Sequence, residues 1–239
     1  MKSSLGFDPR EIPWTPPAGE WPALPSDWLT ADRIKQAFDN PPAWTPEVKR
    51  EPAFGQRPPK DAAVLFPIVL RGEQGTQAHV LLTQRTMHLS THAGQIAFPG
   101  GRVDAEDKSI EDAALREAQE EVGLAAHFVD VVGCMPSYIT GTAFHITPVI
   151  GLVSPHHVVT PNAFEVEAVF EVPLHFLMNP ANHRLHQIER EGVLRQWYSM
   201  PYLEPQASKD GTCTERFIWG ATAGMIRNFY RFLLAANSL

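Results

Sequence analysis

Cysteine is scarce in this chain of 239 residues, which contains only Cys134 and Cys213. The two thiols lie far apart in the sequence and form no Cys-x-x-Cys pair, so neither a disulfide framework nor a zinc knuckle is predicted. We expect both side chains to be buried as small hydrophobic groups. Two isolated thiols also suit a reducing compartment.

Excess positive charge and long apolar runs are lacking as well. The formal net charge is −7 and the pI is near 5.8, which provides no basic field that could follow a phosphate backbone and disfavours a general nucleic-acid binder. No stretch approaches the roughly 20 apolar residues that cross a bilayer, and the N-terminus has no signal-peptide core. We therefore expect a cytoplasmic protein with neither a membrane nor a nucleic-acid partner.

Proline, in contrast, is abundant and unevenly distributed. About half of the 22 prolines fall in residues 1–60, and this density forbids long helices and central strands. We interpret residues 1–60 as an irregular proline-rich arm with one short helix within 26–40. Four tryptophans would pin the arm to the core or to a second subunit, so a homodimer stays open. These residues are Trp14, Trp21, Trp28 and Trp44.

Residues 61–239 have the pattern of one layered domain. Apolar runs of strand length recur, a short strand ends in Pro-Gly-Gly, and the final stretch has helical spacing. This mixture predicts an α/β or α+β fold. The predicted strands cover 62–70, 79–85, 95–101, 128–135, 144–153 and 165–172, and the predicted terminal helix covers 219–236.

A further helix is predicted between Ser109 and Gly123. Ser109 can cap its first turn with Asp112 three residues later, and Gly123 can adopt the left-handed conformation that ends it. At roughly 100° per residue, three glutamates fall within an arc of about 100°. The opposite side of the helix would pack against the rest of the protein. The glutamates are Glu117, Glu120 and Glu121, and the packing residues are Leu115, Ala118 and Val122.

The position of these carboxylates favours a bound cation. They crowd the C-terminal half of the helix, where the helix dipole disfavours anions, and Glu117 and Glu121 form a like-charged pair four residues apart. The plain alternative is a solvated acidic face. Mg²⁺ prefers carboxylate oxygens, water and substrate phosphates, so the cluster suggests a metal that bridges to a pyrophosphate.

These residues resemble the Nudix box, G-x5-E-x7-R-E-U-x-E-E-x-G-U, in which U is a bulky aliphatic residue. Gly101, Asp107 and the stretch REAQEEVGL over 116–124 carry the resemblance. The segment from Gly101 to Arg116 is one residue longer than the box, and Asp107 stands where a glutamate is expected.

The stretch LLTQRTMHLSTHAGQIAFPGG over 81–101 is similar to the motif that precedes the box in coenzyme A pyrophosphatases. Ser90 replaces an arginine of that motif, which removes an expected phosphate contact. Segments 147–151, 162–174 and 218–223 also resemble this subfamily.

The resemblance implies a Nudix α/β/α sandwich with a mixed sheet, the box helix on one face and the terminal helix on the other. It implies a pyrophosphohydrolase dependent on Mg²⁺ or Mn²⁺, which would cleave coenzyme A or a derivative to 3′,5′-ADP and 4′-phosphopantetheine. One alternative is hydrolysis of another nucleoside diphosphate derivative, such as an ADP-sugar or a dinucleotide. The other is a module that binds a nucleotide without cleaving it, which we would expect to lack box glutamates.

By the same resemblance, Glu117 and Glu121 are metal ligands, Glu120 is a ligand or the catalytic base, and Arg116 orients a glutamate. A carboxylate outside the helix often completes such sites. Glu165 is the candidate, and Glu167 on the same strand face is the alternative.

Residues before the helix complete the predicted site. Gly100 and Gly101 would let the backbone approach metals and phosphates, and Arg85 would contact a phosphate or form a structural salt bridge. His88 and His92 have a spacing that could ligate zinc on a helix. The glycines and prolines that follow, and the missing third ligand, argue against this zinc site. His156 and His157 are interpreted as a loop.

Overall fold

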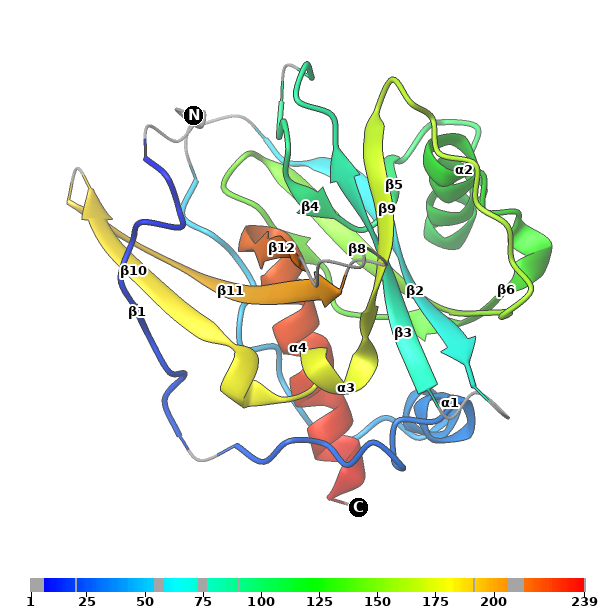
Figure 1. Cartoon of the computed structure of the whole chain (residues 1–239), viewed down its shortest axis with the longest axis horizontal. Helices are drawn as coiled ribbons and strands as arrows, with labels where there is room; N and C mark the ends of the chain where they lie inside the picture. The colour runs from blue at the N-terminus through cyan, green and yellow to red at the C-terminus, as the bar shows by residue number, and fades with distance from the viewer. Residues whose placement is uncertain are drawn as a thin grey trace.

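A mixed sheet forms the centre of the protein (Figure 1). The computed structural model describes residues 7–19, 21–53, 58–72, 77–89, 91–190, 192–205 and 213–238. The strand order is β4-β3-β2-β8-β6, while β5 pairs with β2, β7 with β8 and β9 with β3. The strands are β2 (Lys60–Arg71), β3 (Gln77–Arg85), β4 (Ile96–Ala97), β5 (Gly100–Arg102), β6 (Val129–Cys134), β7 (Tyr138–Ile139), β8 (Phe144–Val153) and β9 (Val166–Pro173).

The pairing of β2 with β8 makes the sheet mixed. These two strands are parallel, with Leu65 opposite Val149, whereas the other pairs are antiparallel. Parallel strands covered on both faces are continuously apolar, which explains why β2 is a single hydrophobic run. The strands predicted from apolar runs are therefore confirmed, but 95–101 divides into β4 and β5.

Helices cover the two faces of this sheet. On β2, Phe66 and Ile68 belong to the core under α4 (Gly220–Asn237), whereas Leu65 and Val69 belong to the core under α2 (Ile110–Val122). Alternate side chains of a strand point to opposite faces, so one strand supplies both cores. The predicted α/β/α sandwich, with the box helix and the terminal helix on opposite faces, is confirmed.

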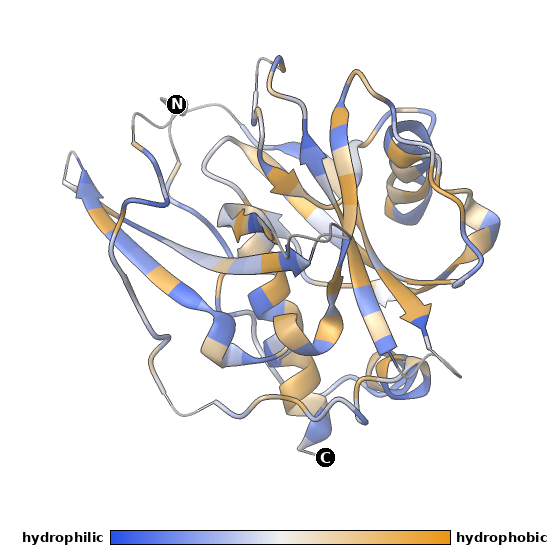
Figure 2. Ribbon diagram, in the orientation of Figure 1, coloured by the Kyte–Doolittle hydropathy of each residue, from blue (hydrophilic) through white to orange (hydrophobic). Residues whose placement is uncertain are grey.

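A second, four-stranded antiparallel sheet was not predicted. Its strands lack the continuous apolar runs on which the prediction relied, and Figure 2 shows β10 banded in hydrophilic and hydrophobic colours. The order is β1-β10-β11-β12. The bounds are β1 (Trp14–Thr15), β10 (Arg184–Arg190), β11 (Val193–Pro205) and β12 (Cys213–Trp219). The short helices α3 (Leu174–Leu177) and η3 (Pro180–Asn182) lie between β9 and β10, and η2 (Ala126–Phe128) lies between α2 and β6.

The N-terminal arm packs against the rest of the chain. Its predicted short helix is α1 (Ala31–Asp39), and Trp21, Trp28 and Trp44 are partly buried against the core under α4. Trp14 remains 47% exposed. The tryptophans that pin the arm therefore contact the core of the same chain, and the division at residue 60 stays a prediction.

An ion cluster joins the arm to α4. Arg227 of α4 is fully buried, and its Nε donates to Oε2 of Glu47 in the arm at 3.0 Å. Tyr198 donates to the same carboxylate, and Arg231 contacts it at 2.8 Å. The buried guanidinium thus depends on a partner 180 residues away in sequence.

The expectation of buried cysteines is wrong. Cys134 and Cys213 are both exposed, and each is a terminal residue of its strand, β6 or β12. Within the described ranges, no helix is long and apolar enough to span a membrane.

The Glu47–Arg227 pair should be important for stability. Glu47→Gln should lower the free energy of unfolding by about 3 kcal/mol, because the change leaves a buried charge without its counterion. Lys35→Ala is the matched control: its ion pair with Asp130 is exposed, so at most about 1 kcal/mol is expected. Urea unfolding measures both. A loss for Glu47→Gln no larger than for the control contradicts the assigned role.

Candidate functional site

Helix α2 begins and ends as the sequence predicts. The Ser109 hydroxyl accepts a hydrogen bond from the Asp112 N–H at 3.1 Å, and Gly123 has φ of 68°. The last carbonyls of the helix are also satisfied by the loop before β9. Thr160 N donates to Val122 O at 2.7 Å, and Asn162 N donates to Glu121 O at 2.9 Å. The helix is therefore fixed at both ends.

The three glutamates differ in exposure, so the plain alternative of a solvated acidic face does not hold for all of them. Glu121 is buried with 4% exposure, while the Glu120 side chain is 59% exposed and that of Glu117 is 16% exposed. Ala118 and Val122 pack as expected. Glu121 lies on the packed side because its carboxylate finds polar partners at the sheet.

The partners of Glu121 come from two strands. Arg85 at the end of β3 donates from Nη1 to Oε1 at 3.2 Å, and the Gly100 N–H at the start of β5 donates to Oε2 at 3.1 Å. The structure thus brings Arg85, Gly100 and Glu121 together. For Arg85 it shows the salt-bridge alternative, although its buried Nε has no hydrogen-bond partner among the described residues.

The two glycines allow the backbone to approach the carboxylates. A methyl group at Gly101 would overlap the carboxylate of Glu117, and one at Gly100 would meet the β2 backbone, within 2.6 Å of Val64 Cα. Both close approaches require the absence of a Cβ. The absence of side chains at Gly100 and Gly101 therefore lets the β5 backbone lie against β2 and against the Glu117 carboxylate.

Arg116 organises the outer carboxylates. Its guanidinium donates to both oxygens of Asp107, at 2.8 and 2.9 Å, and to Glu117 at 3.0 Å and Glu120 at 3.2 Å. Asp104 lies at 3.7 Å. The predicted orienting contact is present, and Asp107, whose role the sequence left open, is seen to hold the arginine.

Negative charge exceeds positive charge at this site. Burial, together with Glu165 and Glu117, raises the pKa of Glu121 to about 7, against the opposing effects of the Gly100 N–H and Arg85. Burial also raises the pKa of Glu117. Hydrogen bonds from Arg116 lower the pKa of Asp107 to about 2. A bound cation would offset both the burial and the like-charge repulsion that raise the pKa values of Glu121 and Glu117.

Glu165 and Glu167 differ in their surroundings. Glu165 precedes β9 and is close enough to Glu121 to raise its pKa. Its backbone oxygen accepts from Thr86 N at 2.9 Å. Glu167 lies exposed within β9 and is not among the causes of that shift. Of the two carboxylates, Glu165 is the one that acts electrostatically on Glu121, and the choice between Glu165 and Glu167 stays a prediction.

No three histidine, cysteine, aspartate or glutamate side chains in the described part of the chain already converge as a metal-ligand set. Arginines hold the α2 glutamates instead. Glu121 accepts the two bonds from Arg85 and Gly100, and Glu117 accepts one from Arg116, whereas an ionised carboxylate offers about four acceptor positions. Both retain the capacity to bind a divalent cation.

The histidine pairs have other partners. His88 contacts the ring of Phe164, and His92 bonds to the Gln95 side chain at 2.9 Å. His157 Nδ1 lies 2.9 Å from Ser154 O in the loop after β8. Ser90 lies outside the described residues.

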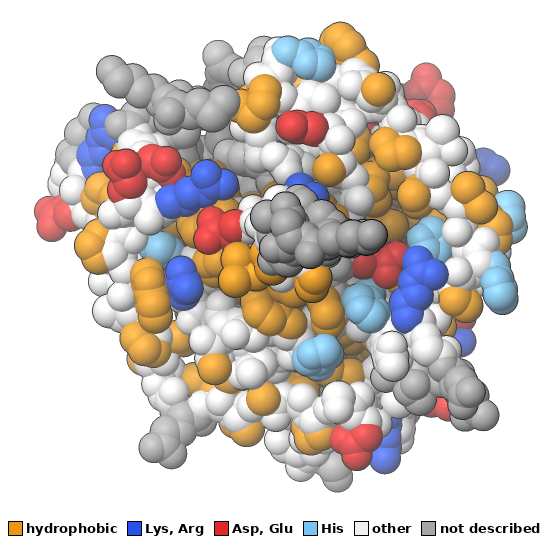
Figure 3. Space-filling model, viewed as in Figure 1, with side chains coloured by type: hydrophobic (Ala, Val, Ile, Leu, Met, Phe, Trp, Pro, Cys, Tyr) orange, Lys and Arg blue, Asp and Glu red, His pale blue; other side chains and the backbone are white. Residues whose placement is uncertain are grey.

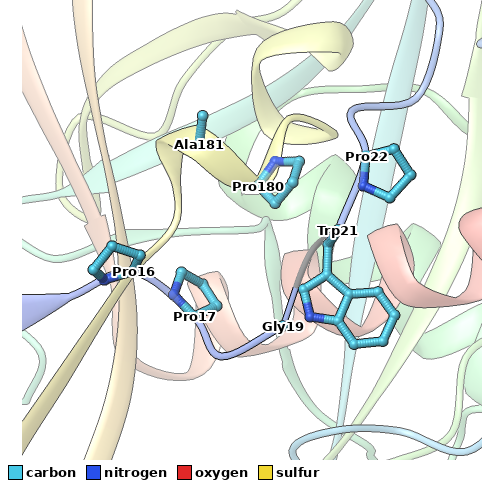
Figure 4. A pocket seen from close by; sticks show the side chains of 7 residues that line it. All are labelled: Pro16, Pro17, Gly19, Trp21, Pro22, Pro180 and Ala181. Atoms are coloured by element: carbon cyan, nitrogen blue, oxygen red, sulfur yellow. The ribbon is translucent and has the colours of Figure 1, made fainter.

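A surface hollow of about 590 Å³ lies on the arm (Figure 4). The described residues that line it belong to the arm and to η3 and include none of the residues of the carboxylate site. Its walls are Pro16, Pro17, Gly19, Trp21, Pro22, Pro180 and Ala181.

Sequence reasoning missed the connection between α2 and the loop before β9. That loop supplies Asn162 and Thr160 to the helix end and places Glu165 beside it. The four free carbonyls at a helix C-terminus require partners, and this requirement was the available signal. It does not identify which distant segment supplies them.

The chain was compared with known proteins. A model of the NUDIX domain matches residues 60–214. An uncharacterized Nudix hydrolase NudL of Shigella flexneri serotype 5b is 40% identical over 186 residues, covering 76% of this chain and 85% of that protein. The NudL of Escherichia coli O7:K1 is 41% identical over 172 residues, covering 70% and 80%.

Among solved structures, the Nudix hydrolase RenU of M. smegmatis is 27% identical with a TM-score of 0.42, covering 50% of this chain and 73% of that one. The domain match spans more than half of the chain, and the two NudL relatives reach at least 40% identity. The chain therefore belongs to the Nudix hydrolase family and is a pyrophosphohydrolase.

Proposed function

We propose that the protein is a coenzyme A diphosphatase that cleaves coenzyme A or a derivative to 3′,5′-ADP and 4′-phosphopantetheine. The observation that carries the proposal is the contact between the motif before the box and the box helix. Gly100 N–H binds Glu121, and Gly101 lies against Glu117. The motif that resembles coenzyme A pyrophosphatases therefore forms part of the carboxylate site itself.

Nudix hydrolases generally need divalent metal cations, and we assign Mg²⁺ or Mn²⁺ to this one. Glu117 and Glu121 would hold the metal, with Glu120 as an additional ligand, because carboxylate oxygens are the ligands these ions prefer. When bound, the metal would neutralise phosphate oxygens and lower the pKa of the attacking water.

The chain's own residues would orient the metal-binding glutamates, hold the substrate phosphate and remove a proton from the attacking water. Glu165 or Glu120 takes the proton of the attacking water. Arg116, anchored by Asp107, keeps Glu117 and Glu120 oriented. The free Nε of Arg85 is a donor for a phosphate oxygen, while its Nη1 continues to hold Glu121.

Substrate choice is tested by comparing the turnover of coenzyme A, ADP-ribose and NADH by the purified protein in Mg²⁺ and Mn²⁺. Preference for coenzyme A supports the proposal. Equal or better turnover of the other two assigns the enzyme to ADP-sugars or dinucleotides. Nucleotide binding without turnover of any substrate assigns a non-catalytic module.

Glu121→Gln should reduce kcat by at least about 100-fold, because the change removes a charged metal ligand but keeps an oxygen for the Gly100 N–H. Steady-state hydrolysis in Mg²⁺ measures this. Activity within about threefold of the parent would rule out metal catalysis at α2. Urea unfolding of the variant separates lost chemistry from lost folding.

Glu165→Gln and Glu167→Gln form a matched pair. The first should lower kcat at least about tenfold, since a general base contributes roughly 10² to 10⁴ in rate, while the second should stay within about twofold. The pH dependence of kcat should change only for Glu165→Gln. The reverse order of effects would make Glu167 the carboxylate that completes the site.

Gly101→Ala and Gly100→Ala should fail in different ways. At Gly101 the new methyl displaces the flexible end of Glu117, so hydrolysis should fall at least about tenfold while stability changes by less than about 1 kcal/mol. At Gly100 it meets the β2 backbone, so unfolding should become easier by about 1–3 kcal/mol. Urea unfolding and hydrolysis assays measure the two effects. Equal stability losses would contradict the described contacts.

A further inference from the structure

An exposed aromatic ring lies directly beside the carboxylate site. Phe164 precedes Glu165 and is 67% exposed. Its ring centroid lies 4.9 Å from that of His88, with the planes tilted by 57°, and the neighbouring Met87 is 44% exposed. We call Met87, His88 and Phe164 the aromatic rim.

The rim joins two loops at one end of the sheet. His88 and Met87 belong to the loop between β3 and β4, and Phe164 to the turn before β9, at the top of Figure 1. Figure 3 shows a histidine and hydrophobic side chains together at that edge of the molecule. The two loops are in direct contact, because Thr86 Oγ1 donates to Phe164 O at 2.9 Å.

The backbone beneath the rim is held on both sides. Phe164 N donates to the Asn162 side chain at 3.1 Å, and Asn162 N donates to Glu121 O of α2 at 2.9 Å. Thr86 N donates to Glu165 O. The ring is thus exposed on a backbone tied to the metal-binding helix, and such preorganisation lowers the cost of binding.

The chemistry of the rim identifies its ligand. Single exposed apolar residues are ordinary, but here the rings of Phe164 and His88 are in contact, and Phe164 directly precedes Glu165 of the predicted diphosphate site. The rim is the size of one ring rather than of a protein interface, which needs about 1,000 Å² or more. It carries no lysine or arginine that could hold a phosphate. A planar heteroaromatic base can stack on such a surface.

We propose that the aromatic rim stacks the purine base of the nucleotide substrate, with Phe164 as the main platform and His88 supporting its ring. The proposal rests on the proposed diphosphatase function, since it places the base beside the cleaved diphosphate. Phe164 would contact only the base of the substrate and not its phosphates. Its side chain has no role in proton transfer.

Binding to the intact protein tests the proposal. AMP and ribose 5-phosphate differ by the base, so calorimetry with both probes isolates its contribution. The parent should bind AMP about tenfold more tightly than ribose 5-phosphate, and Phe164→Ala should remove that preference, since stacking on one aromatic side chain is worth about that factor. Phe164→Trp should retain it.

Leu194→Ala is the control, because Leu194 is also exposed, at 55%, but lies on β11 of the second sheet. It should leave the AMP preference unchanged. The proposal is overturned if the parent binds both probes equally, or if Phe164→Ala keeps the parental preference.

Kinetics provide a second readout. With the adenine-containing substrate that the parent hydrolyses fastest, Phe164→Ala should raise KM about tenfold and leave kcat within about twofold. If the KM of Phe164→Ala equals that of the parent, the proposed stacking on the aromatic rim is overturned. Hydrolysis by the parent would still support the proposed diphosphatase function. If the parent hydrolyses none of the substrates, the proposed diphosphatase function is wrong. The comparison of AMP and ribose 5-phosphate binding still tests whether the aromatic rim stacks a base.

Discussion

The contact between the Gly100–Gly101 backbone and the carboxylates of α2 is the constraint on which the site depends. Glu121 can be buried because an N–H and a guanidinium meet it there, and an ion buried without such partners would be expelled or neutralised. Gly101 leaves room for the neighbouring Glu117. The sheet edge, rather than the helix alone, therefore determines where the acidic groups point.

The loop before β9 extends this arrangement to the open side of the site. By binding the carbonyls at the end of α2, it satisfies the backbone of the helix and carries Phe164 and Glu165 to the same place. The requirement of a helix for C-terminal partners thus also fixes the position of the two residues proposed to act on the substrate. The hydrogen bonds that terminate the helix are the same ones that place Phe164 and Glu165.

The sequence predicted the central strands and α2 well because β2, β3 and β8 contain apolar runs and α2 carries clear capping residues. The arrangement of these elements as a sandwich came from the resemblance to the Nudix family, which the box residues carry. The sequence did not predict features that depend on residues far apart in the chain, namely the burial of Glu121 and the second sheet. The spacing placed Glu121 on a carboxylate face but gave no sign that it is buried against Arg85 and the Gly100 N–H. The second sheet lacks continuous apolar runs, and its pairing with the arm has no local signature.

The bond between Glu47 and Arg227 has a consequence for biosynthesis. The two residues are separated by 180 positions, so the arm leaves the ribosome long before the helix that completes its binding site. Contacts of such separation form late and slowly. The tryptophans of the arm that pack against the core under α4 therefore gain this packing surface only after nearly the whole chain has been made.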